Sequence, residues 1–343
     1  MLLERLTEAN GVSGNEGEVR DIIRREIEGM VDEVRTDVLG NLIAIQRGDG
    51  PTVMLAAHMD EVGFIISGIE KDGLLRFEKV GGIDDRVLPS KRVVVGPDKV
   101  PGVIGLKPVH LQEPSEREEP VKADRLFVDV GAGSREEAEK KVKVGSYACF
   151  HTRFERLSEK TVKAKALDDR VGCAVLIEAL RHSSDLKRRP FTLAAAFTVQ
   201  EEIGLRGAGV AAWALEPDLA LVLEGTICAD VPGTDPHLEG TRLGDGPALS
   251  MMDRTSIASK GLLTHLVRTA RDRGIPFQYK RITAGGNDAG RIHLTREGVQ
   301  TASVSVPCRY IHSPCSVMSM KDFENAVRLV NAFLDSIEGG LRV

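Results

Sequence analysis

The sequence is poor in aromatic residues, in long apolar runs and in paired cysteines. Its 343 residues include one Trp, and aromatic residues make up 4% of the chain, which argues against a sugar-binding groove built from aromatic platforms. No apolar run approaches the roughly 20 residues of a membrane-spanning helix, and the N-terminus MLLERLTEAN lacks a signal-peptide core. The five cysteines are scattered without a repeated C-x-x-C. We therefore expect a reduced, cytoplasmic protein without a membrane partner.

The chain also lacks an excess of positive charge. Its formal net charge is −5, which argues against nucleic acid or an anionic membrane surface as the main partner. Hydrophobic residues make up 42% of the chain and charged residues 28%, as in an ordinary soluble protein. The length is sufficient for a full core and favours two domains.

What the chain does contain is a set of short apolar runs that end in polar side chains. The run at 191–199 has the length and composition of a strand buried on both faces, and it stops at Glu201 and Glu202. Two carboxylates at the end of a buried strand are costly unless a proton or cation compensates them. Ligands bind at the carboxyl ends of strands in open α/β sheets, so one glutamate can ligate a metal while the other acts as general base. A strand that ends in a solvated acidic turn is the alternative.

Other apolar segments place similar groups at their ends. Residues 53–57 precede His58, and Asp60 is placed to orient the imidazole by accepting a hydrogen bond; an unrelated core histidine is the alternative. Asp168 precedes an apolar helix, where a carboxylate either caps the helix or bridges two metals. The metal-competent groups at such positions are His58, Asp168, Glu202, Glu224 and His312.

Two histidines and three carboxylates are what a pair of zinc or cobalt ions needs, with the metals about 3.5–4 Å apart and one carboxylate bridging them. Glu201 is then the spare acid that takes a proton from the water between the metals. The glycine-rich turn at 285–290 either lines a pocket or is a plain turn. Within it, Gly286 and Asp288 are the candidates for substrate binding.

The pattern changes between Glu61 and Lys165. Short β-like runs alternate there with turns rich in Gly, Pro and charge, without long helices. This predicts a small β-barrel or sandwich at 63–162, inserted between two halves of an α/β domain at 1–62 and 163–343. Near the N-terminus, Ser13 and Glu16 have the spacing of a capping box at the start of a helix.

Six blocks of the sequence resemble those of the tetrahedral (TET) aminopeptidases, a family of cytosolic dinuclear-metal exopeptidases that includes proteins labelled glutamyl aminopeptidases or endoglucanases. The blocks are HMDEVGF, ALDDRVG, TVQEEIGLRGA, ADVPG, GGNDAG and RYIHSP. The resemblance implies a zinc-peptidase-like α/β/α sandwich with a mixed sheet and an inserted small β-barrel-like domain. It further implies that the insert mediates dimerisation and that dimers assemble into a hollow tetrahedral dodecamer.

The resemblance also implies roles for the site residues. Asp168 would bridge the two metals, Glu201 would be the general base, and Asp60 would be the partner of His58. The other ligands would divide between the metals, as His58 with Glu224 and Glu202 with His312. Many family members carry Asp where this chain has Glu224; the longer side chain is still a competent ligand, and the exact geometry at that ligand stays open.

These observations predict a metal-dependent aminopeptidase that hydrolyses the N-terminal residue of short peptides with a free N-terminus. The two metals would lower the pKa of a water, and Glu201 would move its proton to the leaving amine. A dinuclear deacylase acting on N-acylated amino acids uses the same chemistry and remains an alternative. A glycoside hydrolase would use two carboxylates but would leave His58 and His312 without a role. The preferred side chain and the native metal stay open.

Overall fold

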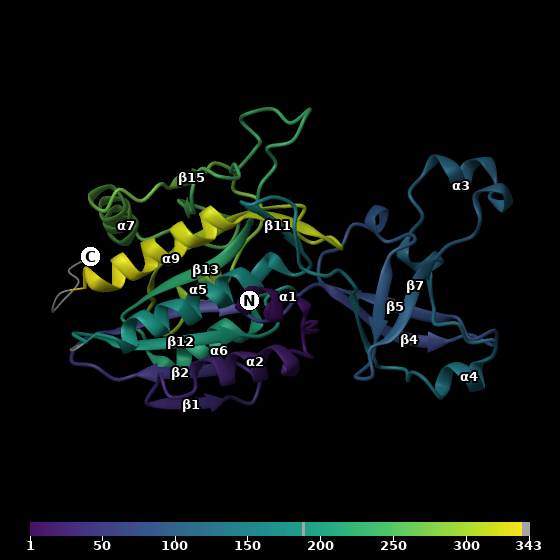
Figure 1. The fold of residues 1–343 in the computed structure, drawn as a ribbon, viewed down its shortest axis with the longest axis horizontal. Coiled ribbons are helices and arrows are strands. Elements are labelled where there is room, and N and C mark those ends of the chain that lie inside the picture. Colours follow the sequence, from purple (N-terminus) through teal and green to yellow (C-terminus); the bar gives the residue numbers. More distant parts are fainter. Residues whose placement is uncertain (187–188, 338–343) are drawn as a thin grey trace.

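The computed structural model describes residues 1–186 and 189–337, which form an α/β part and a smaller β part that projects from it (Figure 1). No helix in these described ranges has both the length and the apolar character needed to cross a bilayer. The predicted fold class, an α/β/α sandwich with a mixed sheet and a barrel-like insert, is confirmed.

The α/β part is built on a mixed sheet of eleven strands with the main order β1-β2-β12-β3-β13-β16-β17-β11-β10. Strands β12, β3, β13 and β16 are mutually parallel and form its centre, and β1, β2, β11 and β17 pair antiparallel nearer the edges. Strand β14 pairs with β15 and β16 away from this path. The bounds are β1 Glu33–Thr36, β2 Leu42–Gln46, β3 Thr52–His58, β10 Glu155–Arg156, β11 Thr161–Ala164, β12 Thr192–Thr198, β13 Leu219–Ile227, β14 Ala248–Ser250, β15 Gln278–Lys280, β16 Gln300–Arg309 and β17 Ser316–Ser319.

Helices cover both faces of this sheet, because alternate residues of its central strands are apolar in both directions. In β3, Val53 and Leu55 belong to a core shared with α1, α2, α5, α7 and α9. Met54 and Ala56 pack instead with α6 and α8 on the other face. The helices are α1 Leu2–Glu8, α2 Gly17–Ile27, α5 Leu167–Ser184, α6 Arg206–Leu215, α7 Lys260–Asp272, α8 Ala289–Ile292 and α9 Met320–Asp335.

The projecting part is a closed antiparallel barrel with the order β4-β5-β8-β7-β6-β9. It has its own apolar core, in which Phe64 packs edge-on against Phe77 and Phe150 with centroid distances of 5.0 and 5.1 Å. Its elements are β4 Gly63–Ile69, β5 Leu75–Val80, η1 Asp85–Val87, β6 Arg92–Val95, β7 Val100–Gly105, η2 Val109–Leu111, α3 Pro114–Glu118, η3 Ala123–Arg125, β8 Phe127–Asp129, α4 Arg135–Glu139 and β9 Tyr147–Phe150.

The last part of the segment predicted as the insert lies in the large sheet. Strand β10 pairs with β11, and β11 pairs antiparallel with β17 in the register Thr161↔Ser319. The barrel strands therefore span residues 63–150, and the chain rejoins the α/β part before residue 162.

The parallel register of the central strands decides which side chains meet. Thr198 at the end of β12 lies opposite His58 at the end of β3, and Glu224 of β13 lies opposite Ser305 of β16. The chain reverses direction or enters a loop after each of these strands, so their carboxyl ends form one polar edge. The candidate site lies at this edge.

Candidate metal centre

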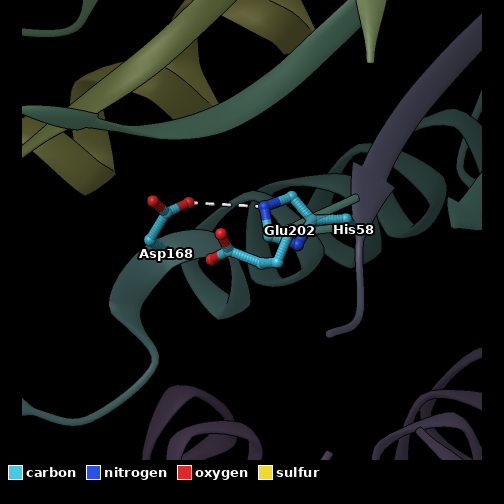
Figure 2. Close-up of side chains that lie close together, drawn as sticks. All are labelled: His58, Asp168 and Glu202. Carbon is cyan, nitrogen blue, oxygen red and sulfur yellow. Dashed lines mark ion pairs between the residues drawn. The ribbon is translucent and has the colours of Figure 1, made fainter. Parts of the chain in front are cut away.

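All five predicted metal ligands come together at the edge formed by the strand ends. His58 terminates β3, Glu202 follows β12, and Asp168 lies where the chain enters α5. Figure 2 shows Asp168 and His58 facing each other, with Glu202 beside them. Three sets of side chains have potential ligand atoms within 4.8 Å of one another. They are His58 with Asp168 and Glu202, His58 with Glu201 and Glu224, and Asp168 with Asp169 and Glu224.

Asp168 lies between the two histidines. Its Oδ1 is 3.3 Å from His58 Nε2, and its Oδ2 is 3.5 Å from His312 Nε2. Glu224 Oε1 is 3.1 Å from the same nitrogen of His58, and Glu202 Oε2 is 3.2 Å from that of His312. Donor atoms about 2.0–2.2 Å from one tetrahedral cation lie about 3.4 Å from each other. These separations match those of ligands gathered around a bound cation.

Burial and charge at this centre also fit a bound cation. Glu224 Oε2 is buried and has no hydrogen-bond partner among the described residues. Burial raises the pKa of Glu202 to about 7 and that of Glu224 to about 8. Burial opposes protonation of His312, but the Asp168 hydrogen bond and the charge of Glu202 prevail and raise its pKa to about 9. Without a cation, the centre therefore holds protons that metal binding would displace.

The ring of His58 is oriented through its other nitrogen. Nδ1 lies 3.1 Å from the backbone oxygen of Asp60 and 3.4 Å from its carboxylate Oδ1. A proton on Nδ1 can be donated to these two oxygens, and Nε2 then faces the space among the carboxylates of Asp168 and Glu224, where it can ligate a cation. Asp60 is thus the neighbour of His58 that the sequence predicts, although its carbonyl makes the closer contact.

The carboxylate of Asp60 also accepts hydrogen bonds from residues other than His58. Its Oδ1 accepts from Glu201 N–H at 3.0 Å, and its Oδ2 accepts from Glu202 N–H at 3.1 Å and from Ser13 Oγ at 2.6 Å. Burial alone would raise the pKa of Asp60, but hydrogen bonds from His58, Ser13 and Glu201 lower it. Asp60 therefore fixes the backbone that carries both glutamates.

The capping box predicted from Ser13 and Glu16 is wrong. Helix α2 begins after Glu16 without a side-chain cap, because both side chains are used elsewhere. Ser13 donates to Asp60, and Glu16 Oε1 accepts from Gly14 N–H and from Gln200 N–H at 3.2 Å. The spacing of the two residues is the same in either case, so the sequence held no signal for this tie to the loop after β12.

Asp169 is a further buried carboxylate that the sequence did not mark as part of the site. Its Oδ2 accepts from His58 N–H at 3.0 Å, and its Oδ1 accepts from Gly172 N–H at 2.9 Å. Burial and the charge of Glu224 raise its pKa well above the usual value. The neighbouring guanidinium of Arg170 is fully buried and donates to the backbone oxygens of Met59 and Leu6. These bonds hold the start of α5 against the end of β3.

Glu201 occupies a different place from Glu202. Its Oε2 is 3.9 Å from His58 Nε2, farther than the 3.1 Å of Glu224 Oε1. Burial, opposed by the charge of His58, raises the pKa of Glu201 well above the usual value. A carboxylate that lies beside the ligands, rather than among the closest contacts, and that retains a high proton affinity suits a general base.

A cavity of about 480 Å³ opens beside these groups. Glu201, Glu202, Glu224 and Asp168 line it, and so does Gly286 of the predicted glycine-rich turn. Asp288 lies buried instead, where its Oδ2 accepts a hydrogen bond from Thr198 Oγ1 at 2.5 Å and its Oδ1 has no partner among the described residues. Its role in substrate binding stays a prediction.

Known proteins are similar to this chain over most of its length. The profile of the M42 glutamyl aminopeptidases matches residues 40–329. A putative aminopeptidase of Acetivibrio thermocellus is 41% identical, covering 96% of each chain. The lysyl aminopeptidase of Pyrococcus furiosus is 35% identical, covering 98% of this chain and 97% of its own.

Two solved structures are similar in the same way. The TET aminopeptidase of a marine-sediment thaumarchaeon superposes with a TM-score of 0.95 at 42% identity, covering 98% of this chain and 96% of its own. The TET1 peptidase of Pyrococcus horikoshii, which can assemble into a tetrahedron or a large octahedral shell, gives a TM-score of 0.86 at 36% identity and covers 97% of this chain and 98% of its own.

A mixed sheet covered by helices on both faces, with histidines and carboxylates gathered at the carboxyl ends of its parallel strands, defines a metal-dependent hydrolase. The chain belongs to the M42 glutamyl aminopeptidase family. It is a metal-dependent aminopeptidase, as the sequence predicts.

Proposed function

We propose that the chain is a dinuclear aminopeptidase that removes the N-terminal residue from short peptides. The position of Asp168 is the main support, since its two oxygens face His58 and His312 separately. A carboxylate shared between two cations, each with one histidine and one glutamate, uses every member of the predicted ligand set. Zinc or cobalt suits the mixture of imidazole and carboxylate ligands.

The cations would polarise the scissile carbonyl and make a water more acidic. Glu201 takes the proton of the attacking water and delivers it to the leaving amine. Its raised pKa allows the carboxyl to hold that proton between the two steps. Asp60 keeps the base in place by accepting the Glu201 backbone N–H at 3.0 Å.

The charge of the cavity favours a free N-terminus. Four carboxylates line the cavity, and Glu201 is the one that the proposed ligand set does not use. A substrate ammonium supplies the opposite charge, whereas an N-acyl group supplies none. We therefore favour an aminopeptidase over a deacylase that acts on N-acylated amino acids.

Self-association is the second part of the proposal. The closed barrel has its own core and projects from the catalytic part (Figure 1), so it is available for contacts between copies. The similar TET1 peptidase of Pyrococcus horikoshii can assemble into a tetrahedron. We propose that barrels pair into dimers that build a tetrahedral dodecamer.

A cytoplasmic location fits the five cysteines, which are all free in the structure.

Paired substrates test the catalytic proposal. Metal-stripped protein is reloaded with zinc or cobalt and assayed on leucine p-nitroanilide and on its N-acetyl form. We expect hydrolysis of the free-amino substrate alone, restored by metal and lost with chelator. Release of acetate from the N-acetyl form, with the anilide bond left intact, would favour the deacylase. Elemental analysis that finds one metal per active chain would exclude the dinuclear centre.

A further inference from the structure

A cleft between the barrel and the α/β part opens next to the catalytic cavity, the cavity of about 480 Å³ at the metal centre. Its first part has a volume of about 820 Å³ and shares Ile311 and His312 with the catalytic cavity. Its second part, of about 520 Å³, shares Lys91 and Lys163 with the first. We call the two parts together the barrel-side cleft. The cleft therefore begins at a proposed metal ligand and leads away from it.

The lining of the barrel-side cleft carries an excess of positive charge. Its cations are Arg86, Lys91, Arg92, Arg153 and Lys163, and its carboxylates are Asp84 and Glu155. The chain as a whole has the opposite sign, with a formal net charge of −5. The positive charge is thus a local property of this surface, and the overall composition of the chain does not account for it.

Both carboxylates of the cleft are already paired with cations of the cleft. Asp84 accepts hydrogen bonds from Arg86, from Nη2 at 2.5 Å and from Nε at 3.0 Å. Glu155 Oε1 lies 2.9 Å from Lys163 Nζ, and the side chain of Glu155 is 59% exposed whereas that of Lys163 is 22% exposed. An ion pair with such an exposed carboxylate adds little to stability, so Lys163 can exchange Glu155 for a ligand.

Three cations of the cleft remain without a carboxylate. Neither Lys91 nor Arg153 has a carboxylate within ion-pair distance among the described residues. Arg92 Nη2 lies 3.1 Å from Nδ1 of His151, and this nitrogen has to accept because a guanidinium only donates. Burial and the charges of Arg92 and Arg153 lower the pKa of His151. The cleft thus holds positive charge that a ligand carboxylate can neutralise.

We propose that the barrel-side cleft binds a carboxylate on the leaving part of the peptide, which is either the C-terminal carboxylate or an acidic side chain after the first residue. The inference rests on the aminopeptidase function proposed above. Lys91 and Lys163 are the main contacts, because each of them lines both parts of the cleft. The cleft is then a second specificity site, separate from the cavity that holds the first residue.

The order of the two spaces decides which end of a peptide enters the cleft. In the proposed function, the α-amino group and the scissile carbonyl lie beside Glu201 and the cations in the catalytic cavity. A positively charged cleft repels the ammonium of a peptide and attracts its carboxylates. The chain after the scissile bond therefore passes His312, which lines both spaces, and enters the cleft. A short peptide with both ends free carries its two charges in the matching order.

Peptides with free and amidated C-termini test the proposal. The metal-loaded enzyme is assayed on Leu-Gly, Leu-Gly-Gly and Leu-Gly-Gly-Gly and on the amide of each, so that each pair differs in the terminal charge. A second comparison, of Leu-Glu-Gly amide with Leu-Gln-Gly amide, changes only the charge of a side chain. A higher kcat/KM for the free acids identifies the C-terminal carboxylate as the ligand, and one for the Glu peptide identifies the acidic side chain. No preference in either comparison would overturn the proposal.

Removal of the two main cations should weaken the preference. Lys91→Met/Lys163→Met should lower the ratio of kcat/KM between the charged and the uncharged substrate by about 3- to 30-fold, the effect of two partly exposed ion pairs. The ratio cancels any general loss of activity. Raising NaCl from about 20 to about 500 mM should also lower the wild-type ratio, because salt screens such pairs. A double variant that keeps the wild-type ratio would reject the role of these lysines.

Lys99→Met/Lys160→Met is the matched control. It removes the same charge from two exposed lysines that do not line the cleft. Lys99 pairs with Glu18, and both side chains are exposed, so this change should leave the ratio within about twofold. Equal losses in the two double variants would assign the preference to the net charge of the protein and would reject the cleft.

A binding measurement separates failure of the cleft from failure of the proposed function. If the wild-type enzyme cleaves none of the peptides, the proposed function fails, and the same peptides then serve as stable ligands. Calorimetry on the metal-loaded protein should show tighter binding of Leu-Gly-Gly than of its amide, or of the Glu peptide than of the Gln peptide. The difference should be lost in Lys91→Met/Lys163→Met. Equal binding within both pairs by the wild type would reject the cleft.

Discussion

Ser13 donates a hydrogen bond of 2.6 Å to Asp60, and both residues are buried. This bond ties the segment before α2 to the loop that follows β3. Asp60 also accepts hydrogen bonds from the backbone N–H groups of Glu201 and Glu202. Ser13 is therefore linked through Asp60 to the loop after β12. The hydroxyl of Ser13 thus takes part in placing both proposed catalytic glutamates without touching either.

Replacement of Ser13 by alanine tests this tie. Ser13→Ala removes a hydrogen bond to a buried carboxylate, so we expect the free energy of unfolding to fall by about 1.5–3 kcal/mol. We also expect kcat to fall while metal content remains near wild type, because Ser13 contacts none of the proposed ligands. Denaturant unfolding, turnover and elemental analysis measure the three quantities. Ser13→Thr keeps the hydroxyl and should stay closer to wild type; equal behaviour of the alanine and wild-type proteins would contradict the argument.

The two adjacent glutamates should fail in different ways. Glu201→Gln keeps the size of the side chain but cannot accept the proton, so we expect near-normal metal content and a loss in kcat of about 10²–10⁴-fold. Glu202→Gln should lose a metal, because Glu202 Oε2 lies 3.2 Å from His312 Nε2, and excess zinc or cobalt should partly rescue it.

Metal stoichiometry and turnover measured on both variants decide the assignment. Each glutamate serves as the control for the other, since the substitution is the same and the positions are adjacent. If Glu201→Gln is the variant that loses metal, the two roles are exchanged.

Asp168→Ala should be more damaging to metal content than His58→Ala. Asp168 faces both histidines, at 3.3 and 3.5 Å, so its loss removes negative charge and a ligand from both proposed cations. His58 would ligate only one of the two proposed cations. Elemental analysis of purified protein measures the difference. Two metals per chain in Asp168→Ala would remove that residue from the bridging position.

Metal binding should release protons and strengthen as pH rises. The pKa values of Glu202 and Glu224, about 7 and 8, are raised by burial, and that of His312 is raised to about 9. These groups hold protons near neutral pH that a cation has to displace. Affinity should therefore increase between pH 6 and 9. Calorimetry in buffers of different ionisation enthalpy counts the released protons, and an enthalpy independent of the buffer would contradict the expectation.

The same groups should make the metal-free protein less stable as pH rises. An acid or a histidine whose pKa is raised by folding binds protons more tightly in the folded state than in the unfolded state. Its contribution to the stability of the fold is therefore lost as pH rises through its pKa in the folded state. The Tm of the metal-free protein should thus decrease between pH 6 and 9, and metal should reverse the decrease. Glu224→Gln lacks one of these protons and should show a weaker trend.

Removal of the barrel should dissociate the assembly without unfolding the catalytic part. Phe64 at the start of the barrel is paired with Ala148 near its end, so a short linker from Val62 to His151 can replace residues 63–150. The barrel core is separate from the core of the α/β part. Light scattering should then show a small soluble particle with poor activity. A deletion variant that keeps the size of the full-length assembly would contradict the proposed role of the barrel.

The sequence by itself determined which segments become buried strands and which groups stand at their ends. A run such as 191–199 has to be buried on both sides, because its apolar side chains leave no polar face, and its short length favours a central strand. The polar residues that follow such a strand lie at the edge of the sheet. His58, Glu202 and His312 were found in this way, whereas Glu224, predicted to follow the end of its strand, lies within β13, which continues to Ile227. The local pattern is sufficient here because the burial of a strand depends on its own composition.

Only the tertiary structure decided which of these groups meet. Ser13 and Glu16 have the spacing of a capping box, yet they bind Asp60 and Gln200, which are distant in sequence. In the sequence, Lys280 is one more charged residue in a polar stretch. In the structure, β15 pairs with β14 and Lys280 lines the cavity. Such contacts depend on how strands far apart in the chain are ordered in the sheet. The order of the strands results from the packing of the whole core. The residues that neighbour each site residue in the sequence therefore do not indicate it.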